Sequence, residues 1–268
     1  MAQTEVFAPA KINLTLHVTG RRSDGYHLLD SLVMFAEVGD VVRVAPAAEM
    51  SLRVTGPMAT GVPENSGNLC WRAAEAFGEP VAIELEKHLP AAAGIGGGSS
   101  DAAAVLRAME RLFGRAFHGD PLALGADVPV CLLARAARMS GIGEIVQPVR
   151  CDAVQTVLVN PRVAVSTPEI FRRLTTRDNP PMEPELATMD LPWLKQQRND
   201  LQPPAQALQP VIGEVLVALR DVGAGLARMS GSGATCFGVF ETRAEAETAA
   251  QRLAALHPGW WVAATKLA

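Results

Sequence analysis

Apolar and polar side chains alternate along several stretches of the first half of the chain, and this alternation predicts strands. Every second residue of residues 12–18 is apolar, which is the period of a strand with one buried face. Lys11 and Asn13 belong to the polar set, so we expect them to lie together on an exposed face. The same pattern predicts strands over 38–44, interrupted by a Gly-Asp pair, and over 81–86.

Two other stretches carry apolar residues at helical spacing. The first is residues 69–77, preceded by Asn68, a residue type that caps helix N-termini. The second is residues 105–113, preceded by the glycine-rich stretch 89–104. The predicted order is therefore strand, glycine-rich loop, helix.

The glycine-rich loop is suited to bind a phosphate group. A helix N-terminus carries free N–H groups and a partial positive charge, and glycines let an anion approach the main chain. The loop lacks the lysine of the GxxxxGK[ST] motif, and Ser99 stands where a GxGxxG motif needs its last glycine. A phosphate site of a third kind is one interpretation, and a flexible turn of small residues is the other.

The second half of the chain predicts an antiparallel sheet backed by helices. Ser166 and Pro168 supply the cap and first-turn proline of one helix. Four prolines within residues 175–197 predict a long connection, which would suit a lid over a site. The expected elements are a strand over 153–159, helices over 166–174, 200–208 and 210–222, strands on either side of the small-residue loop 229–235, a helix over 243–256 and a strand over 260–265.

Composition and charge are those of a globular protein. The chain has 268 residues, of which 49% are hydrophobic and 19% charged. A net charge of -4 and 5% aromatic residues do not favour nucleic-acid binding. Four widely spaced cysteines are typical of reduced thiols. The sequence shows neither a signal peptide nor an apolar run long enough for a membrane span, so we expect a cytoplasmic protein without membrane or nucleic-acid partners.

Three groups of side chains could carry chemistry. Lys11 and Asn13 share a strand face, and Tyr26 and His27 follow an Asp-Gly hairpin turn, where they could stack on a planar ligand. Asp127 is a carboxylate in largely apolar surroundings. It is either the cap of a helical turn or a catalytic group. Lys11 could instead be an ordinary solvated residue of a strand, and His27 could instead be a packing residue.

Three motifs occurring in this order resemble the superfamily of galactokinase, homoserine kinase, mevalonate kinase and phosphomevalonate kinase. They are Ala8-Pro9-Ala10-Lys11-Ile12-Asn13-Leu14, the loop 90–104, and Ser230-Gly231-Ser232-Gly233-Ala234. Within that superfamily, residues 11–14, 21–27, 97–101 and 125–129 are similar to the 4-diphosphocytidyl-2-C-methyl-D-erythritol kinases. The resemblance runs from about residue 6 to the last predicted helix.

The resemblance implies an α+β fold with two domains. Residues 1–150 would form a ribosomal-protein-like ATP-binding domain, and residues 151–268 a ferredoxin-like antiparallel sheet with helices on the substrate side. The implied reaction is ATP-dependent phosphorylation of the 2-hydroxyl of diphosphocytidyl methylerythritol, in the non-mevalonate isoprenoid pathway. The implied partners are this small molecule, ATP and Mg²⁺, and the implied assembly is a monomer or weak homodimer.

The resemblance also assigns roles to single residues. Asp127 matches the base that takes the proton from the hydroxyl, and Lys11 matches the lysine beside it. The positions that match substrate contacts are Asn13, Tyr26, His27, Thr167 and Phe171, with Tyr26 and Phe171 on the two faces of the cytosine. The positions that match ATP contacts are Asn68, Pro90, Gly94, Gly96, Gly97, Gly98, Ser99 and Ser100. Ser99 or Ser100 could bind the metal, and no distant carboxylate is singled out.

Residues 130–138 depart from the family pattern, in which aromatic residues and a glycine are more common. This departure leaves the loop geometry near Asp127 open. Two other functions stay as alternatives: another kinase of the superfamily, and a non-catalytic nucleotide-binding or regulatory protein. Tyr26-His27 and the triple glycine argue against the first, and the presence of both Lys11 and Asp127 argues against the second.

Overall fold

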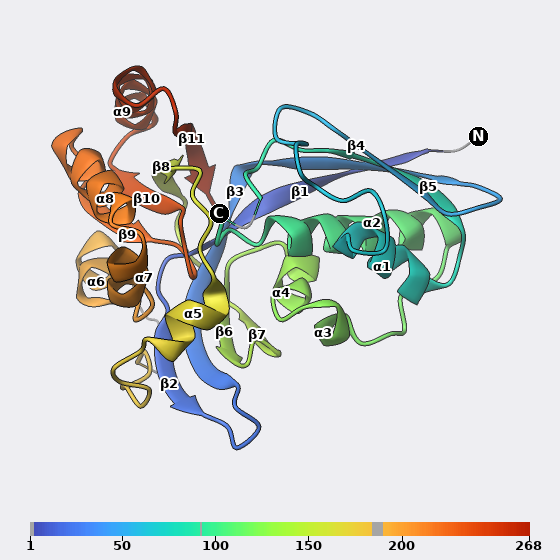
Figure 1. The fold of residues 1–268 in the computed structure, drawn as a ribbon, viewed down its shortest axis with the longest axis horizontal. Coiled ribbons are helices and arrows are strands. Elements are labelled where there is room, and N and C mark those ends of the chain that lie inside the picture. The colour runs from blue at the N-terminus through green and yellow to red at the C-terminus, as the bar shows by residue number, and fades with distance from the viewer. Residues whose placement is uncertain (1–2, 92, 184–189) are drawn as a thin grey trace. The chain divides into compact units, whose positions relative to one another are not determined.

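The computed structural model describes residues 3–91, 93–183 and 190–268 (Figure 1). The chain divides into two compact units, each built from three segments. Unit 1 consists of Met1–Lys11, Val38–Ala91 and Gly96–Ala134, and unit 2 of Ile12–Glu37, Ala92–Ile95 and Arg135–Ala268. The long strands β1 (Thr4–Asn13) and β3 (His27–Pro46) contribute to both units. The functional division at residue 150 stays a prediction.

Unit 1 is a group of paired strands with helices α1 and α2 on one face (Figure 1). β3 pairs antiparallel with β5, β5 pairs parallel with β4, and β1 pairs with β3. The remaining elements of unit 1 are β4 (Ser51–Thr55), α1 (Leu69–Phe77), β5 (Val81–Glu86), α2 (Gly97–Phe113), α3 (Pro121–Leu124) and α4 (Val128–Leu133).

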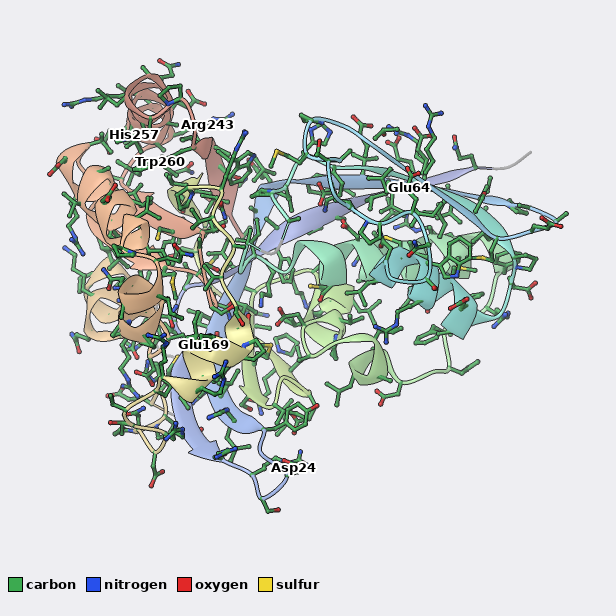
Figure 2. All side chains as sticks on the ribbon, viewed as in Figure 1. Asp24, Glu64, Glu169, Arg243, His257 and Trp260 are labelled. Atoms are coloured by element: carbon green, nitrogen blue, oxygen red, sulfur yellow. The ribbon has the colours of Figure 1, made fainter. Side chains whose placement is uncertain are left out.

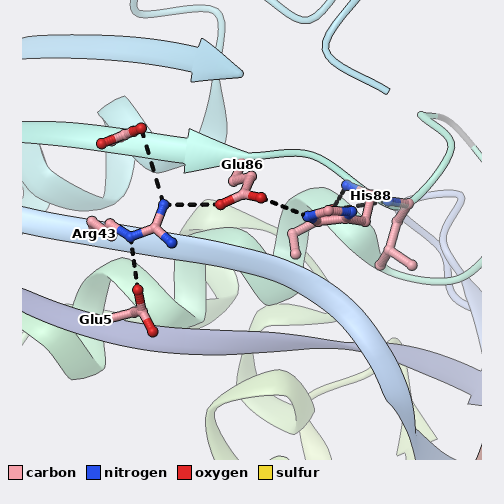
Figure 3. A network of polar contacts seen from close by, with 7 residues as sticks. Glu5, Arg43, Glu86 and His88 are labelled. Atoms are coloured by element: carbon pink, nitrogen blue, oxygen red, sulfur yellow. Dashed lines mark hydrogen bonds and ion pairs between the residues drawn. The ribbon is translucent and has the colours of Figure 1, made fainter. Parts of the chain in front are cut away.

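Strand β5 shows how the sequence pattern separates two environments. Val81, Ile83 and Leu85 are buried in the core that α1 and α2 cover, whereas the alternating positions are partly exposed. On that outer face Arg43 of β3 lies 2.9 Å from Glu86, as Figure 3 shows. The strand thus has one apolar and one charged face, as its period predicts.

Unit 2 contains the antiparallel sheet backed by helices that the sequence predicts. β8 pairs with β10 and β11, and β10 pairs with β9, all antiparallel. β2 and β6 pair with the first half of β3, and β7 pairs with β6. Its elements are β2 (His17–Arg21), β6 (Ala137–Gly141), β7 (Ile145–Pro148), β8 (Val154–Asn160), α5 (Thr167–Arg172), α6 (Leu191–Gln196), α7 (Gln202–Leu208), α8 (Val211–Asp221), β9 (Leu226–Met229), β10 (Cys236–Phe240), α9 (Arg243–Leu256) and β11 (Trp261–Leu267).

The core of unit 2 lies between this sheet and helices α8 and α9. Val157 and Val159 of β8 pack with Leu216 of α8 and Leu253 of α9, all fully buried or nearly so. Thr242 and Glu245 cap the N-terminus of α9 with reciprocal hydrogen bonds. At its other end, the rings of His257 and Trp260 stack with centroids 3.7 Å apart, at a position that Figure 2 labels.

Two expectations about the first strands are wrong. Lys11 and Asn13 are 3% and 1% exposed, so the polar face of this region is buried as well. The second strand is not interrupted at Gly39-Asp40, since β3 is continuous from His27 to Pro46. Glycine is required at position 39 because a side chain there would collide with the carbonyl oxygen of Ala8. The pair marks a close approach of β1 rather than a break.

The described residues include no helix that is both long and apolar enough to cross a membrane.

Candidate active site

Lys11 and Asp127 form an ion pair in unit 1. The Nζ of Lys11 lies 2.7 Å from Oδ1 of Asp127, and the two side chains are 4% and 30% exposed. β1 carries the lysine, and the turn before α4 carries the aspartate. A lysine that is so buried needs an anionic partner, and the carboxylate of Asp127 is that partner.

Asp127 occupies the N-cap position of α4, but its side chain makes no capping hydrogen bond. The cap interpretation of the side chain is therefore wrong, because the carboxylate is directed to Lys11 instead. Its backbone carbonyl accepts the helical hydrogen bond from Cys131 N at 3.0 Å. Burial, with the nearby charge of Asp127, raises the pKa of the Cys131 thiol, so this cysteine is inert.

The start of α2 lies against the same lysine. Gly96 has φ +62°, and a β-carbon on it would lie 3.1 Å from Cβ and 3.3 Å from Cε of Lys11. A β-carbon on Gly125, two residues before Asp127, would lie 3.7 Å from Oγ of Ser99. The first residues of α2, the lysine and the turn that carries the aspartate therefore meet within unit 1.

The N-terminus of α2 has the features of an anion site. Gly96 caps the helix without a side chain, and Gly97 and Gly98 follow as its first two residues. The helix therefore presents backbone N–H groups and its positive end, unobstructed by side chains. Ser100 is fully buried, and its Oγ has no hydrogen-bond partner among the described residues. Such an orphaned hydroxyl in a native structure calls for an explanation, and an oxygen-rich ligand or a metal supplies one.

A buried charged cluster of Asp40, Lys87 and Asp101 fixes the start of α2, and it was not predicted. Lys87 forms ion pairs with Asp40 and with Asp101 of α2, the latter at 2.8 Å. Oδ1 of Asp40 accepts hydrogen bonds from the backbone N–H groups of His88 and Leu89 at 2.6 and 2.9 Å. The cluster thus joins β3, the beginning of the loop and the first turn of the helix.

The period of the strands could have revealed this cluster. Asp40 is in phase with the buried Val42 and Val44 of β3, and Lys87 is in phase with the buried Leu85 of β5. Two opposite charges on the core faces of paired strands indicate a buried ion pair, because isolated charges are rarely buried.

Asn68 caps α1, as predicted. Its Oδ1 accepts from Cys70 N at 2.9 Å, and its Nδ2 donates to the carbonyl of Pro63 at 2.8 Å. A β-carbon on Gly98 would lie 3.6 Å from Leu69, so the start of α1 lies beside the start of α2. Pro90 is buried directly after Leu89.

Gly94 belongs to unit 2, where it contacts the small-residue loop 229–235. A β-carbon on Gly94 would come within 2.7 Å of Ser230 O and of Gly233 N and O. Ser230 Oγ donates to Gly94 O and accepts from Asn13 N, both at 3.0 Å. Asn13 Nδ2 donates to Ser31 Oγ at 2.8 Å, whereas the buried Oδ1 of Asn13 has no partner in the described part of the chain.

The aromatic residues predicted to bind the substrate lie in unit 2. The rings of His27 and Phe171 stack with centroids 4.6 Å apart, and Tyr26 is 63% exposed. Burial lowers the pKa of His27, with smaller effects from Arg21 and Arg177, and its Nε2 is buried without a partner among the described residues. Thr167 Oγ1 lies 2.7 Å from Ser232 Oγ.

Two labelled carboxylates in Figure 2 fix the segments that carry these groups. Asp24, in the turn between β2 and β3, accepts from Tyr26 N at 3.2 Å. Glu169, in the first turn of α5, forms ion pairs with Arg172 and with Arg173, the latter at 2.8 Å. The hairpin and the helix are therefore held by local contacts.

The predicted lid over residues 175–197 is described only in part, because residues 184–189 lie outside the described residues. Before them, Arg138 donates to the carbonyls of Met182 and Glu183, each at 2.9 Å, and pairs with Asp30 at 2.7 Å. After them, α6 fills residues 191–196. Closure of this segment stays a prediction.

The described residues contain no group of three or more His, Cys, Asp and Glu side chains placed to hold a metal ion. The prediction that Ser99 or Ser100 binds a metal therefore stays open, with the unpartnered hydroxyl of Ser100 as the observation that fits it.

Comparison with known proteins supports the fold and the order of the motifs described above. The N-terminal domain of the GHMP kinases matches residues 68–135, and the C-terminal domain of the GHMP kinases matches residues 182–259. The 4-diphosphocytidyl-2-C-methyl-D-erythritol kinase of Dinoroseobacter shibae is 58% identical over 97% of this chain and 94% of its own length. That of Paracoccus denitrificans is 55% identical over 97% and 96%.

A solved structure supports the same relationship. The crystal structure of a 4-(cytidine 5'-diphospho)-2C-methyl-D-erythritol kinase is 37% identical, covers 98% of this chain and 99% of that one, and superposes with a TM-score of 0.81. The two-domain α+β kinase fold predicted from the motifs is thereby confirmed. The chain belongs to the 4-diphosphocytidyl-2-C-methyl-D-erythritol kinase family of the GHMP kinases.

Proposed function

We propose that this kinase transfers the γ-phosphoryl group of ATP to the 2-hydroxyl of 4-diphosphocytidyl-2-C-methyl-D-erythritol, a step of the non-mevalonate isoprenoid pathway. The observation that carries the proposal is the Lys11–Asp127 ion pair beside Gly96 at the start of α2. Phosphoryl transfer to an alcohol needs a base, a cation and a phosphate-binding site close together. The names of the relatives supply the acceptor.

Asp127 is the proposed base, and Lys11 its electrostatic partner. As the acceptor oxygen bonds to the γ-phosphorus and the bond from phosphorus to the departing ADP oxygen breaks, Asp127 accepts the proton of the hydroxyl. Lys11 holds the carboxylate in place before the reaction, and its ammonium group stabilises negative charge in the transition state. The partial exposure of Asp127, 30%, is consistent with access by a substrate.

The positions proposed to bind ATP include the start of α2 and its surroundings. The backbone N–H groups of this helix would hold phosphate oxygens, and Ser99 or Ser100 would bind Mg²⁺. When bound, the metal would neutralise part of the negative charge of the phosphates. The proposed ATP-binding residues are Asn68, Pro90, Gly94, Gly96, Gly97, Gly98, Ser99 and Ser100.

The proposed substrate-binding residues lie in unit 2. Two buried polar atoms that have no hydrogen-bond partner among the described residues, Oδ1 of Asn13 and Nε2 of His27, are suited to form hydrogen bonds with a ligand. The exposed Tyr26 ring can stack on cytosine, and Phe171 and Thr167 complete the set. We also place the protein in the cytoplasm, where its four free cysteines would stay reduced. We further propose that it is a monomer or weak homodimer.

The test is ADP release in a coupled assay with a panel of acceptors. Turnover with the diphosphocytidyl substrate, and not with mevalonate, homoserine or galactose, is the expected result. Turnover with one of the other three acceptors alone would instead favour another superfamily activity.

The variant Asp127→Asn should lower kcat by roughly 10²–10⁴-fold. Asp120→Asn is the matched control, because Asp120 is a helix cap that accepts from Leu122 N at 2.9 Å. It should leave both stability and kcat almost unchanged, because asparagine caps a helix about as well as aspartate does. Full turnover by the Asp127 variant would overturn the assignment of the base.

A further inference from the structure

Arg107 of α2 contacts the two elements that carry the catalytic pair. Its Nη1 donates to the carbonyl of Cys131 in α4 at 2.7 Å, and more weakly to that of Leu132 at 3.5 Å. Its Nη2 donates to the carbonyl of Phe7 in β1 at 3.2 Å. One guanidinium group therefore bridges the C-terminal end of α4 and the backbone of β1.

Both contacts lead by a short path to the reacting groups. Cys131 N donates to the carbonyl of Asp127, so the residue held by Arg107 is one helical turn from the base. Phe7 precedes Lys11 by four residues of an extended strand, about 13 Å along a stiff element. Arg107 thus fixes the distance between the elements on which Asp127 and Lys11 are carried.

Helix α4 requires such an anchor. It has only six residues, Val128–Leu133, and a helix of this length is not stable by itself. A cation at its C-terminal carbonyls complements the helix dipole. Burial lowers the pKa of Arg107, and a guanidinium retains its charge there and offers the paired donors that two carbonyls in different directions require.

We propose that Arg107 is a positioning residue for phosphoryl transfer, which sets the geometry of the Lys11–Asp127 pair by bridging β1 and α4. Its effect on rate rests on the function proposed above, whereas its effect on geometry does not. Loss of the bridge shifts the base relative to the lysine, and a displacement of about 1 Å costs about 10²-fold in rate.

Arg115 provides a matched control on the same polypeptide segment. It follows α2 and donates to the carbonyl of Phe77, the last residue of α1, at 2.9 Å. Its guanidinium lies 4.2 Å from the centroid of the Phe77 ring. It therefore does for α1 what Arg107 does for α4, but α1 carries neither Lys11 nor Asp127.

The experiment compares Arg107→Met with Arg115→Met in the full-length protein. We expect Arg107→Met to lower kcat about tenfold to 100-fold, with KM for both substrates within about twofold. Arg115→Met should change kcat less than about twofold, whatever its effect on Tm. The kcat of Arg107→Lys should lie between that of the unaltered protein and that of Arg107→Met. Guanidinium at millimolar concentration should restore part of the kcat that Arg107→Ala loses. It should leave the kcat of Arg115→Ala unchanged.

Crystal structures of the two methionine variants test the geometry without substrate. The Lys11 Nζ to Asp127 Oδ1 distance, 2.7 Å in the unaltered protein, should lengthen beyond hydrogen-bonding range in Arg107→Met and stay the same in Arg115→Met. Equal kcat values in the two variants, or an unchanged distance in Arg107→Met, would overturn the proposal. If the unaltered enzyme does not use the proposed acceptor, the distances still decide the role of Arg107.

Discussion

Two charged clusters lie on opposite faces of the same strands of unit 1, and each is centred on one cation. In the exposed cluster (Glu5, Arg43, Glu84, Glu86 and His88), Arg43 lies 2.7 Å from Glu5 and 2.9 Å from Glu86, as Figure 3 shows. In the buried cluster (Asp40, Lys87 and Asp101), Lys87 contacts both carboxylates and all three side chains are at most 5% exposed. His88 connects them, since its ring contacts Glu86 and its N–H donates to Asp40.

The two clusters differ in what their charges can do. Solvent screens the exposed ion pairs, which also cost side-chain entropy, so their net contribution to stability is small. In the buried cluster the charges are already desolvated, and removal of one leaves the others without compensation. The buried cluster therefore fixes the first turn of α2 at the predicted phosphate site, whereas the exposed one joins strands that are already paired.

The largest expected effect is that of Lys87→Met. The substitution keeps most of the side-chain volume and removes the ammonium, so Asp40 and Asp101 face each other without a cation. The free energy of unfolding should fall by about 3–5 kcal/mol, measured by urea denaturation at pH 8. Lys195→Met, at an exposed lysine, is the control and should change it by less than about 0.5 kcal/mol. An equally small loss for Lys87→Met would show that burial adds nothing to this cluster.

A smaller effect is expected from Asp101→Asn, and it depends on pH. Burial raises the pKa of Asp101 from 3.8 to about 7, against the opposing effect of Lys87. Between these values the folded state holds a proton that the unfolded state has lost. The stability of the unaltered protein should therefore fall as pH rises from about 4 to about 7.

Asparagine has the shape of the protonated acid and does not titrate, so Asp101→Asn should remove this dependence. Urea denaturation between pH 5 and pH 8 measures it, with Asp120→Asn, at an exposed aspartate, as control. Parallel pH curves for Asp101→Asn and the unaltered protein would contradict a raised pKa at Asp101.

The strands, the glycine-rich loop and the helices were predictable because each follows from a local pattern. The β2–β3 hairpin follows from its Asp-Gly turn, where Gly25 has φ +96°, and α9 follows from helical spacing. Lys11 and Asp127 were predictable only through the family motifs, since nothing near Asp127 in the sequence indicates which cation it meets. Their contact joins positions on two separate elements.

Packing of distant segments explains what the sequence did not reveal. The alternation in β1 shows which side chains share a face, but it does not show that a second layer buries Lys11 and Asn13. The strand period puts Asp40 and Lys87 on core faces, but the contact with Asp101 depends on where α2 begins. Arg107 is one of several arginines on or after α2, and only the positions of α4 and β1 distinguish it from Arg115.

The smallest expected effect is that of Arg43→Met in the exposed cluster. Arg43 lies 2.9 Å from Glu86 and, together with His88, lowers the pKa of that carboxyl. Both partners of this pair are in contact with water. Tm at low salt should fall by about 2 °C or less, and the difference from the unaltered protein should vanish near 1 M NaCl, where the Debye length is about 3 Å. The loss caused by Lys87→Met should persist at that salt concentration, because its partners are shielded from ions. A salt-resistant loss for Arg43→Met, or a salt-sensitive one for Lys87→Met, would mean that burial is not what separates the two clusters.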